Sequence, residues 1–145
     1  MSFTTDIKSM NNDEIRQLCA DLGLPKFRAD QLYSWLQKVG VSSYDEMTNI
    51  SKDLRQTLSE KYPLHCCEIE LKRVSKIDET VKYLFRLHDG EFIESVLMKY
   101  KYGYTLCVST QVGCRMGCAF CASGLNGLVR NLSAGEILGQ VISAN

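Results

Sequence analysis

Residues 114–121 read CRMGCAFC and place three cysteines, Cys114, Cys118 and Cys121, within one short stretch. A closed zinc site takes four protein ligands and an ordinary four-iron cluster takes four thiolates, so three cysteines leave a metal centre one ligand short. Gly113 and Gly117 carry no Cβ and would let the backbone approach such a centre closely. The spacing therefore indicates a metal site with one open coordination position.

Other interpretations of the cysteines remain open at this point. Zinc could be bound if Cys107, His65 or His88 supplied a fourth ligand. A disulfide framework is disfavoured, because the chain has seven cysteines, an odd number, and begins without a signal peptide. Reduced cysteines without an export signal predict a cytoplasmic protein, and no apolar run has the length of a membrane span.

The charge balance gives no support for nucleic-acid binding. The 145 residues contain 17 basic and 17 acidic side chains, so the formal net charge is zero. A nucleic-acid-binding domain usually carries a basic excess. The hydrophobic content of 45% is typical of a soluble globular protein.

The first half of the chain is expected to form a small helical domain over residues 1–64. Asn11 and Glu14 have the spacing of a helix-capping pair, and apolar residues then recur at helical intervals. A second helix is predicted over residues 26–39, with Trp35, Leu36 and Val39 on one side and Gly40 as its stop. A third is predicted to end before Pro63.

After residue 65 the apolar pattern changes to period two, which predicts strands. Asp89-Gly90 is typical of a two-residue hairpin turn between a strand that begins at Val81 and one over residues 91–99. A short strand over residues 105–110 is expected to lead directly into the cysteine loop. A helix is then expected to start at Ser133, with Glu136 completing a capping box. The fold class is therefore α/β: a helical domain, a β-hairpin linker region, and the start of a β/α unit.

Glu94 is out of place in the strand over residues 91–99. Its neighbours Ile93, Val96 and Leu97 are apolar, and a buried carboxylate is costly unless it is paired or protonated. Glu94 is either an edge residue that reaches solvent or a functional group, and the pattern alone leaves both open.

The cysteine run, with Phe120 before its last cysteine, resembles the signature of radical S-adenosylmethionine (SAM) enzymes. The surrounding sequence resembles one family of them, the dual-specificity ribosomal RNA and tRNA adenine C2 methyltransferases, over nearly the whole chain. The stretches that carry this resemblance are FRADQ at residues 27–31, EMTNI at 46–50, IESVLM at 93–98, TLCVSTQVGC at 105–114 and RNLSAGEI at 130–137.

The resemblance implies a division of the chain and a set of site residues. Residues 1–64 would be a helical accessory domain that docks RNA, and residues 65–145 a β-hairpin with the first β/α unit of a truncated radical SAM barrel. The implied metal ligands of a [4Fe-4S] cluster are Cys114, Cys118 and Cys121, and Phe120 would contact SAM at the open iron. The implied partners are 23S rRNA, tRNA and an electron donor of the flavodoxin or ferredoxin type.

The resemblance also implies roles for two residues in the transfer of a methyl group to C2 of adenine. Glu94 is a candidate proton acceptor, and Cys107 would release the product from a second, methyl-carrying cysteine by forming a disulfide with it. Whether Glu94 or Cys107 takes the C2 proton stays open. The methyl-carrying cysteine and most of the SAM site have no counterpart in the 145 residues, which therefore resemble an N-terminal fragment.

A second function remains an alternative. The chain could be a non-catalytic zinc or iron–sulfur module joined to a helical domain that docks RNA or protein. The short length favours this alternative, and the sequence around the cysteines opposes it.

Overall fold

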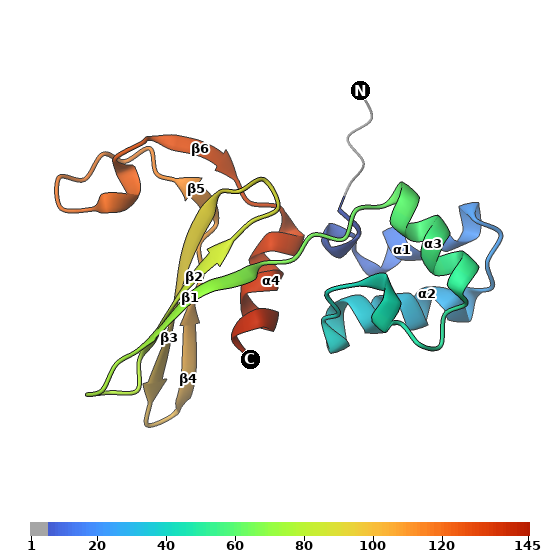
Figure 1. Cartoon of the computed structure of the whole chain (residues 1–145), viewed down its shortest axis with the longest axis horizontal. Coiled ribbons are helices and arrows are strands. Elements are labelled where there is room, and N and C mark those ends of the chain that lie inside the picture. Colours follow the sequence, from blue (N-terminus) through green and yellow to red (C-terminus); the bar gives the residue numbers. More distant parts are fainter. Residues whose placement is uncertain (1–5) are drawn as a thin grey trace. The chain divides into compact units, whose positions relative to one another are not determined.

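The computed structural model describes residues 6–145, which form two compact units (Figure 1). The helical unit ends at Cys66, and the sheet unit comprises Cys67–Asn145. Each unit has its own hydrophobic core. In the described part of the chain, no helix is both long enough and apolar enough to cross a membrane.

The helical unit is built from three α-helices: α1 (Asn12–Asp21), α2 (Lys26–Tyr33) and α3 (Lys52–Lys61). The short element η1 (Ile7–Ser9) precedes α1, and η2 (Ser34–Val39) and η3 (Tyr44–Glu46) lie between α2 and α3. The predicted cap of α1 is confirmed, because Asn11 and Glu14 each accept a hydrogen bond from the other's backbone N–H. The core of the unit consists of Ile7, Ile15, Leu18, Cys19, Ala29, Leu32, Leu36, Val41, Tyr44, Met47, Ile50 and Leu58.

The prediction of one uniform helix over residues 26–39 is wrong in its second half. After Tyr33 the backbone continues as the π-helix η2, in which Gly40 N–H donates to Trp35 O at 3.0 Å. A π-turn holds more residues than an α-turn and shifts the phase of the side chains that follow. Val39, expected on the packed side, is consequently 59% exposed. Gly40 ends the helix in the left-handed conformation, as predicted.

The sheet unit contains an antiparallel sheet in the order β1–β2–β3–β4 and a separate two-stranded sheet, β5–β6. The strands are β1 (Glu68–Val74), β2 (Val81–Arg86), β3 (Phe92–Tyr100), β4 (Gly103–Cys107), β5 (Gln111–Gly113) and β6 (Leu128–Asn131). The predicted strand over residues 105–110 is wrong in extent, since β4 ends at Cys107. The cysteine loop leaves from β5 and returns through β6 (Figure 1).

The hairpin between β2 and β3 is confirmed, but its turn is longer than predicted. Leu87 N–H donates to Glu91 O at 2.8 Å, and Gly90 N–H donates to Leu87 O at 3.0 Å. These bonds enclose three residues, 88–90, and the third is Gly90 with φ +86°. A three-residue turn that ends in a left-handed glycine is a common hairpin connection.

Helix α4 (Ala134–Ala144) packs on one face of the four-stranded sheet, and its predicted capping box of Ser133 and Glu136 is confirmed. The buried side of α4 is small and polar: it contains Gly135, Glu136, Gly139 and Gln140. A Cβ on Gly139 would lie 2.9 Å from Cys67 Sγ, so glycine permits the close approach of helix and sheet. The core around this contact comprises Cys67, Val81, Tyr83, Phe85, Leu87, Ile93, Val112 and Leu132.

Candidate functional site

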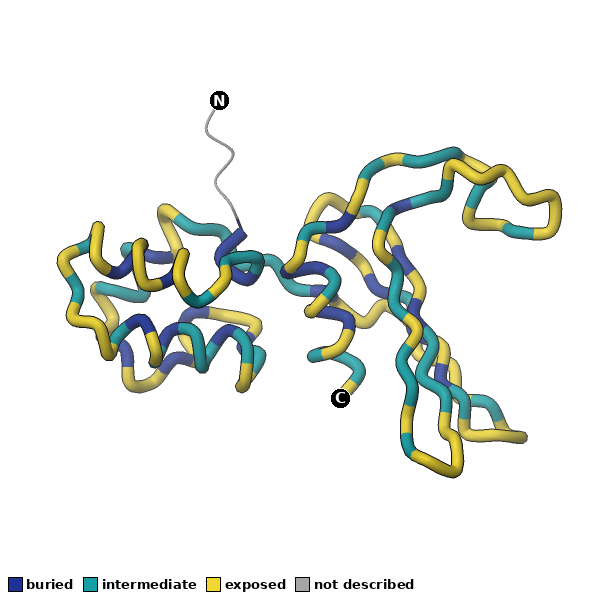
Figure 2. The backbone as a smooth tube through the Cα atoms, turned by 180° about the vertical axis from the view of Figure 1, so that it is seen from behind, coloured by how far each residue is buried: buried dark blue, intermediate teal, exposed yellow. Residues whose placement is uncertain are grey.

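The cysteine loop is fixed at both ends by the β5–β6 hairpin. Val112 pairs with Arg130 and Gly113 with Leu128, and Cys114 N–H donates to Gly127 O at 3.0 Å. The loop beyond this clamp is mostly exposed, as Figure 2 shows. The hairpin, rather than a strand of the larger sheet, therefore determines where the loop begins.

The two glycines beside the cysteines have different roles. Gly113 has φ +72°, and a Cβ built on it would lie 2.0 Å from Gly127 O, so this position needs glycine for the close approach of β5 and β6. Gly117 has φ +61° with nothing within 4 Å of its would-be Cβ. Gly117 therefore provides a left-handed turn, whereas Gly113 closes the hairpin.

We expect Gly113→Ala to disrupt the start of the cysteine loop and Gly117→Ala to leave it largely intact. Both substitutions force alanine into a left-handed conformation, at roughly 1–2 kcal/mol. Only Gly113→Ala adds a clash with Gly127 O. Amide exchange at Cys114, whose N–H is bonded across the hairpin, should accelerate in Gly113→Ala alone. Equal protection of Cys114 in the two variants would contradict this account.

Two of the three loop cysteines share a cavity with Glu94. The cavity has a volume of about 700 Å³, and Glu94, Cys114 and Cys121 are among the residues that line it, together with Ser109 and Ser123. Hydrogen bonds from the backbone and side chain of Ser123 lower the pKa of the Cys121 thiol. A thiol with a lowered pKa reaches the thiolate form that binds metals more readily.

The remaining predicted ligands lie outside this cavity. Cys118 is exposed, and Phe120 is 93% exposed. Among residues 6–145, no three side chains of the metal-binding types come together, so the structure gathers neither the loop cysteines nor a fourth ligand such as Cys107, His65 or His88 into one group. All seven cysteines are free thiols.

Glu94 lies on the open face of the sheet, and its side chain is 52% exposed. Its Oε1 atom is 2.7 Å from Lys82 Nζ on β2. Ion pairs at such exposed positions contribute about 0–1 kcal/mol, so this pair adds little to stability. Glu94 also borders a second hollow of about 240 Å³, lined with Arg73, Lys82 and Leu84. Glu94 is therefore not an edge residue: it reaches solvent from the inner strand β3 and lies beside two hollows.

Cys107 shares this open face with Glu94. Cys107 pairs with Val96 across β3 and β4, and Val96 is two residues from Glu94 on β3. Because side chains alternate between the faces of a strand, all three point to the same side. The opposite face carries Ser95, whose hydroxyl contacts α4. The two predicted catalytic side chains therefore lie on the face of the sheet away from α4.

An ion-pair network behind the loop was missed by the sequence analysis. Arg130 on β6 donates two hydrogen bonds to the Glu136 carboxylate, at 2.8 and 2.9 Å, and also pairs with Asp89 at 2.7 Å. Glu136 is 4% exposed. Burial raises its pKa, but the hydrogen bonds from Arg130 and from Ser133 N–H outweigh this and lower the pKa overall. The network ties the cysteine hairpin to α4 and to the β2–β3 turn.

A second missed residue, Gln140, is fully buried and joins three segments. Its Oε1 atom accepts from Ser95 Oγ at 2.6 Å and from Ser109 N–H at 2.9 Å, and its Nε2 atom donates to Ser109 O at 2.9 Å. The Ser109 hydroxyl in turn donates to Glu94 O at 2.7 Å. Gln140 therefore fixes the segment between Cys107 and the cysteine loop. Its four-residue spacing from Glu136 on an otherwise apolar helix was the one signal in the sequence.

Comparison with known proteins shows what the chain is similar to. Residues 5–64 match the family described as the ribosomal RNA large subunit methyltransferase N-terminal domain. A probable dual-specificity RNA methyltransferase RlmN from Alkaliphilus metalliredigens is 54% identical over 94% of the chain, and one from Bacillus subtilis is 52% identical over 94%. The chain is similar to the N-terminal part of these RlmN methyltransferases over nearly its whole length.

A solved structure extends the likeness to three dimensions. The crystal structure of a radical SAM methyltransferase from Sphaerobacter thermophilus is similar with a TM-score of 0.86 at 41% identity, over 97% of this chain and 41% of that one. The α/β class and the likeness to the start of a radical SAM methyltransferase are confirmed. The chain covers 39% and 37% of the two RlmN relatives named above, so it spans about two fifths of their length.

Proposed function

We propose that the chain is the N-terminal part of a radical SAM methyltransferase that transfers a methyl group to C2 of adenine in 23S rRNA and tRNA. The observation that carries the proposal is the cavity lined jointly by Cys114, Cys121 and Glu94. The RlmN relatives, named as dual-specificity RNA methyltransferases, supply the reaction class.

The donor chemistry of the loop fits a [4Fe-4S] cluster. Cys114, Cys118 and Cys121 would hold it, because three free thiols lie on one loop clamped at both ends by β5 and β6. Such a cluster, when bound together with SAM, would supply one-electron reducing chemistry at this loop. The exposed Cys118 and the exposed Phe120 would have to turn toward the other two cysteines, and the glycine at 117 gives the loop freedom to do so.

Glu94 and Cys107 would act on the adenine base. They share the open face of the sheet, where a base placed over β3 and β4 could contact both side chains. The Glu94 carboxylate would accept a proton, and Lys82 Nζ lies 2.7 Å from its Oε1 atom. Cys107 is exposed and a free thiol, as a group that resolves a covalent intermediate must be.

The helical domain over residues 1–64, most of which matches the N-terminal domain of a ribosomal RNA methyltransferase family, would dock the RNA. A flavodoxin- or ferredoxin-type protein would supply electrons. The 23S rRNA, the tRNA and this electron donor would all be encountered in the cytoplasm. The alternative of a non-catalytic metal module differs in one respect that can be measured: zinc protein is colourless, whereas an iron–sulfur protein is coloured.

The cluster assignment predicts that alanine at any one of Cys114, Cys118 or Cys121 abolishes iron binding, because two thiolates cannot hold four irons. The measurement is the iron and sulfide content of the chain after anaerobic reconstitution. Cys66→Ala is the matched control, since Cys66 is only partly buried and lies in the helical unit. Cys67 is less suitable, because its thiol is packed against α4.

Full iron content in Cys118→Ala would overturn the assignment. Stoichiometric zinc without iron in the unsubstituted chain would instead support the non-catalytic metal module.

A further inference from the structure

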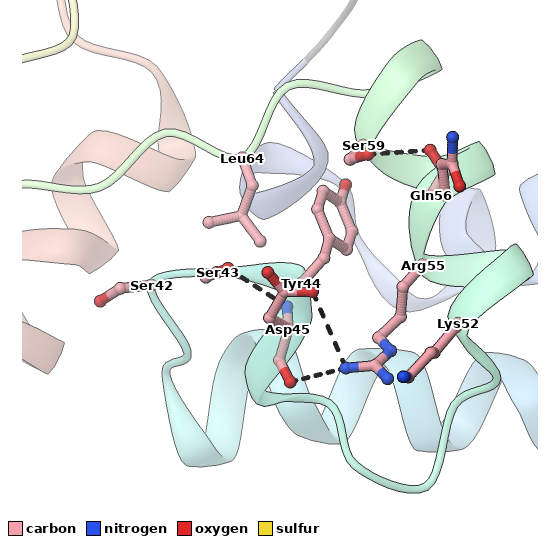
Figure 3. Close-up of a pocket in the computed structure, with 9 residues that line it drawn as sticks. All are labelled: Ser42, Ser43, Tyr44, Asp45, Lys52, Arg55, Gln56, Ser59 and Leu64. Carbon is pink, nitrogen blue, oxygen red and sulfur yellow. Dashed lines mark hydrogen bonds and ion pairs between the residues drawn. The ribbon is translucent and has the colours of Figure 1, made fainter.

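A pocket in the helical unit, here the α3 pocket, contains two cationic side chains that lack a strong acidic partner. It has a volume of about 720 Å³. Figure 3 shows the side chains of Lys52 and Arg55, from the first turns of α3, with their nitrogen-bearing ends close together beside Asp45. The complete lining consists of Ser42, Ser43, Tyr44, Asp45, Lys52, Arg55, Gln56, Ser59 and Leu64.

Arg55 is held in place but not neutralised. Its side chain is 15% exposed, and its Nη1 atom donates to the Asp45 backbone carbonyl at 2.7 Å. The Asp45 carboxylate is 3.9 Å away and is itself 96% exposed, so it is at best a weak ion-pair partner. Arg55 Nε is buried and makes no hydrogen bond to any atom of residues 6–145. A buried donor without a partner is costly, and a ligand oxygen would remove that cost.

Lys52 adds a second charge at the same place. Its side chain is exposed, and within the described chain it takes part in no ion pair. Glu46, which follows Asp45 in the chain, is occupied elsewhere: its carboxylate accepts hydrogen bonds from the backbone N–H groups of Ser42 and Ser43. Two cations lining one pocket match the charge and the acceptor oxygens of a phosphate group.

We propose that the α3 pocket binds a backbone phosphate of the RNA, with Lys52 and Arg55 as its ligands. The proposal rests on the proposed function, which makes RNA the ligand of the helical domain. It also explains how a chain of zero net charge can hold RNA, because a local pair of cations replaces an overall basic excess.

Fluorescence anisotropy of a labelled RNA stem–loop, titrated with the whole chain at several salt concentrations, tests the proposal. Lys52→Gln should weaken binding roughly fivefold and make the salt dependence of log K shallower by about 0.7–0.9, the contribution of one phosphate contact. Lys61→Gln is the matched control, since Lys61 ends the same helix outside the pocket. Asp45→Asn should tighten binding, because it removes a negative charge from the rim and leaves the Asp45 carbonyl in place.

Arg55→Gln removes the bond to Asp45 O as well as the charge, so its circular dichroism spectrum is compared with that of the unsubstituted chain before its affinity is interpreted. Equal RNA affinity and salt dependence in Lys52→Gln and Lys61→Gln would overturn the assignment of the α3 pocket as a phosphate site, and so would the absence of tighter binding in Asp45→Asn. Neither result would contradict RNA binding elsewhere on the chain.

Inorganic phosphate provides the second arm of the test. Amide shifts at Lys52 and Arg55 on phosphate addition, without any RNA binding, would identify a free-phosphate site and overturn RNA as the source. The iron content of the cysteine variants is unaffected by either result, so failure of the pocket is distinguishable from failure of the proposed function.

Discussion

Glu136→Gln is expected to destabilise the sheet unit by roughly 3 kcal/mol, the scale for breaking a buried ion pair by removing one partner. The substitution preserves the shape of the side chain and one acceptor for Ser133 N–H. It removes the negative charge from the group that accepts two of the hydrogen bonds of Arg130. Asp89 remains as a partner for Arg130, but it lies on the turn rather than on α4.

Urea unfolding followed by two signals measures this effect. Trp35 is the only tryptophan and reports the helical unit, whereas far-ultraviolet circular dichroism reports both units. Glu14→Gln is the matched control, because Glu14 occupies the same capping-box position in α1 but is exposed. Glu136→Gln should shift the transition of the sheet unit and leave Trp35 fluorescence unchanged. A shift no larger than that of Glu14→Gln would show that Glu136 acts only as a cap.

The same pair makes stability depend on pH in a defined direction. The pKa of Glu136 is lower in the folded chain than the unfolded value of about 4.3. Its contribution is therefore complete above that value and is lost as the pH falls through the folded pKa. The difference in stability between the unsubstituted chain and Glu136→Gln should accordingly shrink in acid.

The elements that the sequence predicts well are those that depend on neighbours in the chain. The caps at Asn11 and Ser133, the stop at Gly40 and the β2–β3 hairpin are each specified by a few adjacent residues. Strand boundaries depend on distant partners instead. Residues 105–113 have a uniformly extended pattern, and only the pairing of residues 111–113 with residues 128–131 separates β4 from β5.

Burial on α4 does not follow its apolar residues, for a comparable reason. Leu138 and Val141 are the apolar residues that a sequence pattern would bury, yet they are 45% and 48% exposed. Gly135 and Gly139 leave a narrow side on which the helix can approach Cys67 closely, and Glu136 and Gln140 are buried with them. The small size of the glycines decides which side of α4 packs on the sheet, and a hydropathy pattern contains no information on how closely two elements can approach.

The spacing of the three loop cysteines predicts only part of the candidate site. The spacing identifies residue types suited to three-thiolate binding, but it contains no information on which thiols face a cavity. Cys114 and Cys121 line the cavity with Glu94, whereas Cys118 does not. The link between Glu94 and the loop passes through Ser109 and Gln140, which lie far apart in the chain.

Gln140→Met is expected to cost roughly 3 kcal/mol, because it keeps the length of the side chain but removes every bond to Ser109 and Ser95, at about 1 kcal/mol or more for each. Ser95→Ala is the matched control. It removes a single bond to Gln140 and should cost about 1 kcal/mol. Urea unfolding of the sheet unit measures both.

Hydrogen exchange at the Ser109 amide separates a positioning role from simple packing. In Gln140→Met this amide loses its acceptor and should exchange markedly faster, whereas in Ser95→Ala the Gln140 oxygen still accepts from it. Protection of Ser109 that is equal in the two variants would mean that Gln140 only fills space. Faster exchange confined to Gln140→Met would make Gln140 the residue that holds the chain between Cys107 and Cys114 in register with Glu94, since the Ser109 hydroxyl is bonded to the Glu94 carbonyl.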